Sequence, residues 1–393
     1  MRLHQLVLVE IAGALVLTAW ATDRVLLVPA GLVAAVLVLS AALRWRGRPA
    51  LDRITASLAL RARLRAARQP LPVADEGADP ALAPVLECED ALRTYTYTDR
   101  QRGRGVGMVG DGTFLTAVLL VQPRDTPLRA GRDTRPLNLG MLRDALDADG
   151  IRLESVQVVQ HTQPAPGPHL PEHAVAARSY GPLAQTGTPA VRLTWIALKL
   201  DPKLCPEAVQ ARGGGLGGAQ RALLRAADQL ASRLTADGVG ARILSEAEVT
   251  SALATSAGAT AQTGAPAVRP GASARRTEET GRAWRCDDRW HTTYWVGRWP
   301  HLGAGAEASA RVVAALTSTR ASVSTFSLTV SRGGGGTSAV TGHVRITARG
   351  HDELMALRRQ LEEAARAVRV GLVRLDREQL PGVLATLPLG GTR

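Results

Sequence analysis

The most compact group of side chains that could do chemistry is Asp287, Asp288 and His291, in the stretch WRCDDRWHTTYWVGRW at 284–299. Paired carboxylates beside an imidazole can act as general acid and base or help to hold a metal. No second histidine is close in sequence, and no nucleophile elbow accompanies the group. Adjacent aspartates before a strand are more typical of a turn with solvated charges. We therefore predict no catalytic residue, cofactor or metal, and keep a membrane-anchored enzyme with this cluster as an alternative.

Two glycine-rich stretches have the composition of phosphate-binding loops. GVGMVG at 105–110 spells G-x-G-x-x-G, but an Asp-Gly turn and a strand follow where a dinucleotide-binding unit needs a helix. GGGLGG at 213–218 is not followed by a G-K-[ST] sequence, and the two lysines of the chain, Lys199 and Lys203, lack a preceding glycine. We therefore predict no nucleotide site, and we interpret 213–218 as a flexible entry to a helix.

Four of the seven tryptophans lie in the 284–299 stretch. Strand alternation places Trp290 and Tyr294 on one face, and Trp295 and Trp299 on the other. Aromatic side chains on both faces predict a central strand that is covered on each side. A platform for stacked bases would need exposed rings beside basic residues, so a nucleic-acid binder remains an alternative. That alternative depends on Arg285, Arg289 and Arg298.

The positive charge is concentrated in one short segment. The chain has 393 residues and a formal net charge of +13, of which +7 lies between residues 44 and 68. This segment holds eight arginines against Asp52: Arg44, Arg46, Arg48, Arg53, Arg61, Arg63, Arg65 and Arg68. The remaining +6 is modest for a nucleic-acid-binding domain, so we expect no nucleic acid. The three cysteines are far apart in the sequence and predict free thiols in a reducing compartment.

The basic segment directly follows two apolar stretches, Leu3–Ala21 and Val25–Leu43. Each is close to the ~20 residues that cross a bilayer as a helix. We predict a two-span transmembrane hairpin over 1–43, then a basic juxtamembrane helix and linker over 44–84. The arginines place both termini in the cytoplasm, beside the plasma membrane, and we expect them to contact anionic lipid.

Glu10 is the one acidic residue within the two predicted spans. Such a residue either faces a neighbouring helix or extends toward the headgroups. With the small residues Gly13 and Ala14 it forms our candidate helix contact. A cleavable signal peptide, ending at the A-x-A match of 19–21, is the competing interpretation. Glu10 and the second span argue against it.

Beyond residue 84 the predicted elements recur in a similar order. LSEAEVTSALAT at 244–255 and LDREQLPGVLAT at 375–386 share L-x-x-x-[EQ]-[VL]-x-x-x-L-A-T. We predict an α+β fold with two βαββαβ-like (split βαβ) repeats, at 85–255 and 281–393, joined by a disordered linker at 256–280. Whether they form one domain or two stays open. The main predicted strands are 113–121, 151–160, 191–200, 241–244, 290–299, 324–330 and 338–348, and the main predicted helices are 137–148, 219–237, 305–318 and 351–369.

Three stretches resemble the EccE family of actinobacterial type VII (ESX) secretion systems. They are LTWIALKLDP at 193–202, WHTTYWVGRWP at 290–300 and GLVRLDREQLPGVLATLPLG at 371–390. The resemblance implies a non-catalytic scaffold subunit of an inner-membrane secretion complex, beside EccB, the EccC ATPase and EccD. It brings no catalytic residue to this chain.

Overall fold

The computed structural model describes residues 3–22, 27–42, 44–45, 48–69, 79–99, 103–123, 137–164, 191–259, 275–300, 306–319, 321–334 and 337–391. The chain divides into two compact units, Met1–Gln69 and Pro70–Arg393. Residues 70–78 and 260–274, which belong to the two predicted linkers, lie outside the described residues.

The first unit consists of helices and one short strand pair. Its elements are α1 (Leu3–Thr22), α2 (Leu27–Ala42), β1 (Arg44–Trp45), β2 (Arg48–Pro49) and α3 (Ala50–Ala66). The buried small residues of the two apolar helices are Ala12 and Ala19 of α1 and Ala34 of α2. Because alanine lets helix backbones approach closely, these residues suit the packing of α1 on α2.

The two helices of the predicted hairpin are therefore present. The described residues do not support the prediction that these helices cross a membrane. Among the described residues, no helix combines the length and the apolar character that a bilayer span requires. In α1, the polar residues His4, Gln5 and Glu10 interrupt the apolar stretch.

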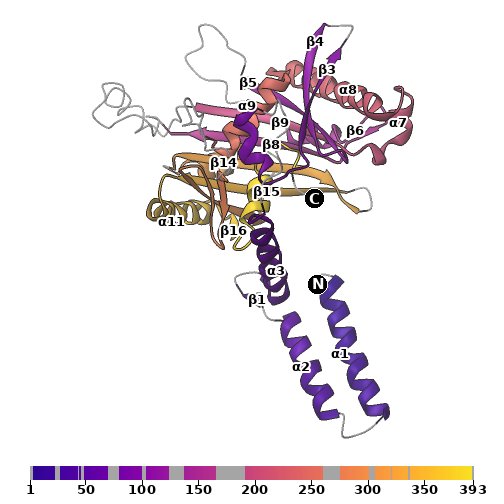
Figure 1. The fold of residues 1–393 in the computed structure, drawn as a ribbon, viewed down its shortest axis with the longest axis vertical. Coiled ribbons are helices and arrows are strands. Elements are labelled where there is room, and N and C mark those ends of the chain that lie inside the picture. Colours follow the sequence, from indigo (N-terminus) through magenta and orange to yellow (C-terminus); the bar gives the residue numbers. More distant parts are fainter. Residues whose placement is uncertain are drawn as a thin grey trace. The chain divides into compact units, whose positions relative to one another are not determined.

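The second unit is mixed α/β and is built on one 12-stranded sheet in which every pairing is antiparallel (Figure 1). Its strands are β3 (Arg93–Asp99), β4 (Arg104–Gly110), β5 (Leu115–Pro123), β8 (Ser155–Gln163), β9 (Val191–Leu200), β10 (Val239–Ile243), β11 (Thr277–Glu279), β12 (Trp284–Cys286), β13 (Arg289–Arg298), β14 (Val323–Arg332), β15 (Ser338–Ala348) and β16 (Gly371–Arg374). Their order is β11-β12-β13-β15-β14-β8-β9-β5-β4-β3, and β10 pairs with β5 while β16 pairs with β13. The predicted α+β class is thus found as a mixed unit with a large antiparallel sheet.

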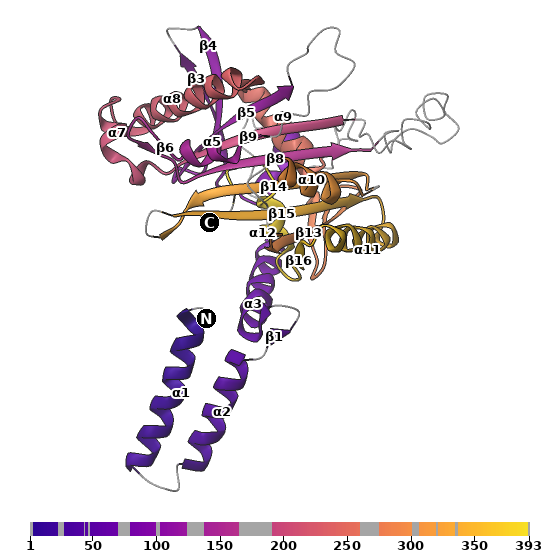
Figure 2. The ribbon, with the colours of Figure 1, turned by 180° about the vertical axis from the view of Figure 1, so that it is seen from behind.

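The helices of this unit are α4 (Ala83–Leu86), α5 (Leu139–Asp144), α7 (Pro206–Gln210), α8 (Gly215–Ala236), α9 (Glu246–Ala257), α10 (Ala306–Thr317), α11 (His351–Ala367) and α12 (Gln379–Leu384). A separate two-stranded pair joins β6 (Asp147–Ala148) to β7 (Ile151–Arg152). Figure 2 shows α8 against one half of the sheet, and α10 and α11 against the other.

The two halves of the sheet follow one strand order. It is β10-β5-β9-β8 in the first half and β16-β13-β15-β14 in the second, and β8 pairs with β14 between them. Equivalent hydrogen bonds close each half. Leu244 N–H donates to Val118 O at 2.9 Å, and Leu375 N–H donates to Thr293 O at 3.1 Å. Leu244 and Leu375 are the first residues of the two similar sequences at 244–255 and 375–386.

Different apolar cores pack against the two faces of the sheet. On one face, α8 packs over β5 and β9, and α10 and α11 pack over the second half, each with its own apolar core. The opposite face carries a third core, in which Val118, Val159 and Trp195 pack with residues of α9 and α12. Because β-strand side chains alternate, the same strands supply both faces.

Strand β13 is a buried interior strand, as its aromatic pattern predicts, but one side chain lies on the other face. The register of β13 against β16 shifts between Val296 and Arg298. This bulge turns Trp299 toward the core that contains Tyr294, where its ring meets Phe326 edge-on at 6.5 Å. The prediction that Trp299 shares a face with Trp295 is wrong, because a bulge interrupts the period of two.

The predicted boundaries differ at two glycine- or proline-rich places. Helix α8 begins at Gly215 and not after residue 218, and the three glycines 213–215 have positive φ. A Cβ on Gly218 would lie 2.5 Å from Val209 O, so this stretch is a closely packed corner and not a flexible entry. The end of the predicted linker is also structured, because Leu82 and Val85 are buried in the core below α9.

We predict that Gly107→Ala lowers the free energy of unfolding by about 1–3 kcal/mol. GVGMVG forms β4, and a Cβ on Gly107 would lie 2.5 Å from the backbone of Ser245 and Glu246. Gly105→Ala is the matched control, since its Cβ would meet only Thr96 Cγ2 at 3.5 Å. Urea unfolding of both variants tests this; equal losses would contradict the close approach at Gly107.

Candidate functional site

The three residues of the candidate helix contact lie together on α1. Glu10, Gly13 and Ala14 are all exposed within this chain, and their spacing places them on one side of the helix. Ala12 and Ala19, which are buried, lie on the opposite side. The predicted contact is therefore not part of the packing between α1 and α2, and it is left open to a neighbour.

The arginines predicted to contact lipid are described only in part. Arg61, Arg65 and Arg68 are exposed, and Arg53 and Arg63 are half-buried. The side chains of Arg44, Arg46 and Arg48 lie outside the described residues. Helix α3 also exposes apolar residues, with Ile54 and Leu58 each 57% accessible.

The cluster of Asp287, Asp288 and His291 is used for structural contacts. Asp287 occupies the turn between β12 and β13 with φ at 51°, and both its oxygens accept from Arg276 at 2.7 and 2.8 Å. Asp288 is largely exposed and pairs with Arg289 at 3.3 Å. His291 is buried on β13, where its Nδ1 lies 2.9 Å from Thr347 Oγ1. No group of three metal-ligating side chains occurs in the described part of the chain.

The buried polar side chains gather instead under α9 and α12. Arg345 of β15 is 1% exposed, and its Nη2 donates to the carbonyl of Ser256 at the end of α9. Its Nε and Nη1 have no hydrogen-bond partner among the described residues. Burial lowers the pKa of Arg345 to about 10. The negative end of the α9 dipole offsets part of the cost of holding this cation in the interior.

The end of α12 is held in a comparable way. Gln157 Nε2 donates to Ala385 O at 2.9 Å, and Ser327 Oγ donates to the same carbonyl at 2.8 Å. Gln157 Oε1 also accepts from Gly390 N–H at 2.8 Å. The polar side chains of β8 and β14 therefore satisfy carbonyls that the helix end leaves unpaired. These side chains therefore stabilise the fold through hydrogen bonds to the backbone.

Two histidines in this interior have strongly depressed pKa values. Burial, and then the nearby Arg345 charge, lower the pKa of His161 to about 3 and that of His291 well below its usual range. Both imidazoles are therefore neutral in the folded chain at neutral pH. A neutral, enclosed imidazole without access to solvent is poorly placed to exchange protons with a substrate.

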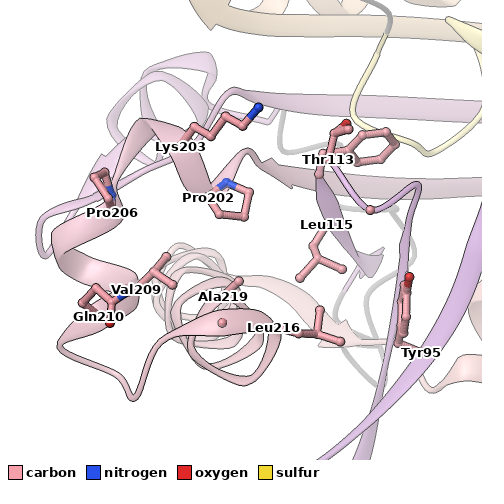
Figure 3. Close-up of a pocket in the computed structure, with 13 residues that line it drawn as sticks. Tyr95, Thr113, Leu115, Pro202, Lys203, Pro206, Val209, Gln210, Leu216 and Ala219 are labelled. Atoms are coloured by element: carbon pink, nitrogen blue, oxygen red, sulfur yellow. The ribbon is translucent and has the colours of Figure 1, made fainter.

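One surface pocket of about 380 Å³ lies between the start of α8, the α7 segment and the β4–β5 turn (Figure 3). Leu115, Leu216 and Ala219 line it with Tyr95 of β3, and Lys203 is at its rim. Leu216 is 52% exposed. The lining suits an apolar group with a negative charge nearby, and it contains none of the predicted interaction residues.

Comparison with known families matches residues 188–296 to the family described as "Putative type VII ESX secretion system translocon, EccE". Over these residues the chain is similar to the EccE family, which supports the resemblance seen in the sequence. The matched region runs from β9 through α8, β10 and α9 into β13, so it includes strands of both halves. It covers two stretches behind the resemblance, 193–202 and most of 290–300, while 371–390 lies beyond it. No curated protein matches the chain.

Sequence reasoning missed β3 as well as the pocket. The strand reads RTYTYTD, and its alternation of threonine and tyrosine is a β-propensity signal that could have identified it. The pocket could not have been found, because α7 and the β4–β5 turn are brought together only by the tertiary structure.

We predict that the stability of the Pro70–Arg393 unit falls as the pH drops from about 6.5 toward 3. An unfolded histidine has a pKa of about 6.5, so the unfolded chain binds more protons than the folded chain in this window. His161 and His291 each add a slope of about 1.4 kcal/mol per pH unit. His161→Gln should remove one such slope in urea unfolding between pH 4 and 6.5. If His161→Gln and the wild-type chain lose stability equally over this pH range, then His161 is protonated in the folded state.

The ion pair of Asp287 supplies a test of the alternative enzyme interpretation. We expect Asp287→Asn to lower the free energy of unfolding by about 3 kcal/mol, because Arg276 then keeps an uncompensated, largely buried charge. Asparagine tolerates the left-handed backbone at this position, so the change isolates the charge. Asp288→Asn should change stability by less than about 0.5 kcal/mol. If Asp287→Asn leaves stability unchanged but abolishes function, the carboxylate has a chemical and not a structural role.

Proposed function

We propose that this EccE-family chain is a structural subunit of a type VII secretion translocon that supports protein export without its own catalysis. The observation that carries the proposal is the family match over residues 188–296. That region is part of the sheet and not an appended segment, because it supplies β9, α8 and most of β13. A scaffold requires a rigid body of this kind.

The contacts of the buried and half-buried polar residues support a structural role. Asp287 pairs with Arg276, His291 is enclosed in the sheet, and Arg345 binds the end of α9. These groups stabilise the fold and offer no open arrangement of nucleophile and base. Energy for export would come from another subunit, for which the resemblance implies the EccC ATPase, and the neighbouring subunits would include EccB and EccD.

We further infer that the first unit attaches the chain to the plasma membrane as a two-pass hairpin, with both termini in the cytoplasm. Large apolar side chains of α1 and α2 are exposed within the chain, among them Leu17 at 66%, Val28 at 73% and Leu32 at 65%. Exposed apolar surface of this extent requires a lipid or protein environment. The arginines from 44 to 68 would bind anionic headgroups beside it.

The exposed face of α1 that contains Glu10, Gly13 and Ala14 is the proposed contact with a partner helix. Small residues let two backbones approach closely, and an acidic residue at this position is stabilised by a polar neighbour. Because Ala12 and Ala19 use the opposite face for α2, both contacts can exist at once.

The experiment is to tag the carboxyl terminus, solubilise native membranes in mild detergent, and identify the proteins that co-purify by mass spectrometry. We expect an FtsK-like ATPase and a multispanning membrane protein in a high-mass native-gel band. Gly13→Leu should reduce their recovery, because the leucine blocks close helix packing. Val28→Leu adds bulk on the exposed surface of α2, where Val28 is 73% accessible, and should not.

A chain that stays in the soluble fraction would contradict the membrane attachment. A membrane-bound monomer in several mild detergents would contradict the scaffold role. Equal recovery with Gly13→Leu and Val28→Leu would place the partner contact elsewhere in the chain.

A further inference from the structure

A row of buried polar side chains crosses the sheet on the face beneath α9 and α12. Arg345 of β15 lies opposite Thr293 of β13 on one side and opposite Thr325 of β14 on the other. Thr325 in turn lies opposite His161 of β8. All four residues are 1% exposed or less. Because residues opposite each other on neighbouring strands project from the same face, the row places Arg345 between side chains of both halves of the sheet.

Arg345 is a buried cation without an anionic partner. Its Nη2 donates to the end of α9, but Nε and Nη1, which carry most of its N–H groups, have no hydrogen-bond partner among the described residues. The one ionisable group whose charge would raise the pKa of Arg345 is the Cys286 thiol. Burial raises the pKa of that thiol to about 12, so it carries no charge at neutral pH. The charge of Arg345 is therefore uncompensated within the part of the chain that the structure describes.

Two neighbouring side chains add further unpaired donors. His291 lies two residues before Thr293 on β13, so both project from the face of Arg345. His291 Nδ1 is 2.9 Å from Thr347 Oγ1, and when Nδ1 accepts from this hydroxyl, the ring proton is on Nε2. Neither His291 Nε2 nor Thr293 Oγ1 has a partner in the described ranges. Their residues are 1% and 0% exposed.

These donors lie together beneath the ends of two helices. Arg345 bonds the last turn of α9, and a Cβ on Gly258, which follows that helix, would lie 3.3 Å from His291 Nε2. The charge of Arg345 is close enough to His291 to lower the pKa of the imidazole, after the larger effect of burial. A Cβ on Gly382 of α12 would lie 2.9 Å from Thr293 Cβ. Two glycine backbones therefore enclose the donors, and a ligand that reaches them must be small.

The chemistry of the ligand follows from these donors. Guanidinium N–H, imidazole N–H and hydroxyl groups are all satisfied by a ligand that only accepts hydrogen bonds. A water molecule satisfies donors but leaves the charge of Arg345 uncompensated, and a buried charge is costly without a partner of opposite sign. A carboxylate or phosphate ligand is too large for the close packing at Gly258 and Gly382. A small monovalent anion meets both conditions.

We propose that Arg345, His291 Nε2 and the Thr293 hydroxyl bind one chloride ion in the interior, between the sheet and the end of α9. The ion would be a structural ligand that neutralises the buried cation and completes the polar row from β13 to β8. It would thereby stabilise the contact between the two halves of the sheet. The proposal goes beyond the scaffold role and does not depend on it.

The test measures the unfolding of the full chain in mild detergent at neutral pH while chloride is exchanged for gluconate. Constant ionic strength keeps the screening of surface charges unchanged, and gluconate is too large for the enclosed site. A ligand that binds only the folded chain stabilises it according to the free ligand concentration. Above the dissociation constant, a tenfold rise in chloride should therefore lower the unfolding equilibrium constant about tenfold.

Substitution of two buried arginines makes the test specific. Arg345→Met keeps an unbranched side chain and removes the charge, so the dependence on chloride should disappear. Arg358→Met is the matched control, because Arg358 is 2% exposed but lies on α11, which packs on the opposite face of the sheet. Its variant should keep the full dependence on chloride, whatever its own stability. Circular dichroism checks that each variant is folded.

A direct binding measurement tests the proposal even if Arg345→Met does not fold. Equilibrium dialysis of the wild-type chain against chloride-36 should give one bound ion per chain, and unlabelled bromide should displace it. Thr293→Val replaces the hydroxyl by a methyl group of similar size. This variant should weaken chloride binding several-fold, because one donor to the ion is lost.

The proposal is supported by stability that depends on chloride in the wild-type chain and in Arg358→Met but not in Arg345→Met, together with one dialysed ion per chain. It is overturned if chloride and gluconate give equal stability, if the two arginine variants respond alike, or if dialysis detects no bound chloride. In those cases the buried donors are satisfied by ordered water and not by an anion.

Discussion

The pairing of β8 with β14 is the constraint on which the rest of the fold depends. Val159 lies opposite Ser327, and the pairs on either side, Val158 with Leu328 and Gln160 with Phe326, continue the antiparallel ladder. Without this pairing, the two halves would be separate sheets, and β8 and β14 would each be an exposed edge strand. With it, the chain forms one sheet whose faces are shared, so α9 and α12 from different halves cover the same surface.

This shared face explains why so many polar side chains are buried. Helices α9 and α12 both end over the sheet, and carbonyls at a helix end need donors when water is excluded. Arg345 supplies one for Ser256, and Gln157 and Ser327 supply two for Ala385. These buried polar side chains are of types that also occur in catalytic sites, but here their burial is explained by the hydrogen bonds that they make to helix ends. The same enclosure keeps His161 neutral and out of reach of a substrate.

Periodic strands could be predicted from the sequence, and contacts between distant segments could not. The predicted strands at 191–200 and 338–348 coincide with β9 and β15, because runs of β-branched and apolar residues dominate them. The predicted face of Trp299 is wrong because the bulge beside Val296 depends on pairing with β16. Of the candidate site, the turn at Asp287 followed from local composition. Its partner Arg276 could not be inferred, because it precedes β11 and meets the aspartate only once β11 and β12 pair.

The likeness of the two halves makes their differences informative. Equivalent backbone bonds at Leu244 and Leu375 support an origin of the sheet in one duplicated unit. The two outer edges have nevertheless diverged. Helix α4 precedes the first half in sequence, yet Glu87 at its end binds the backbone at Thr277 in the second. One short segment can cover only one edge, and here it covers β11. The two ends of the sheet are therefore unequal, because the segment that precedes the first half of the sheet covers the edge of the second half.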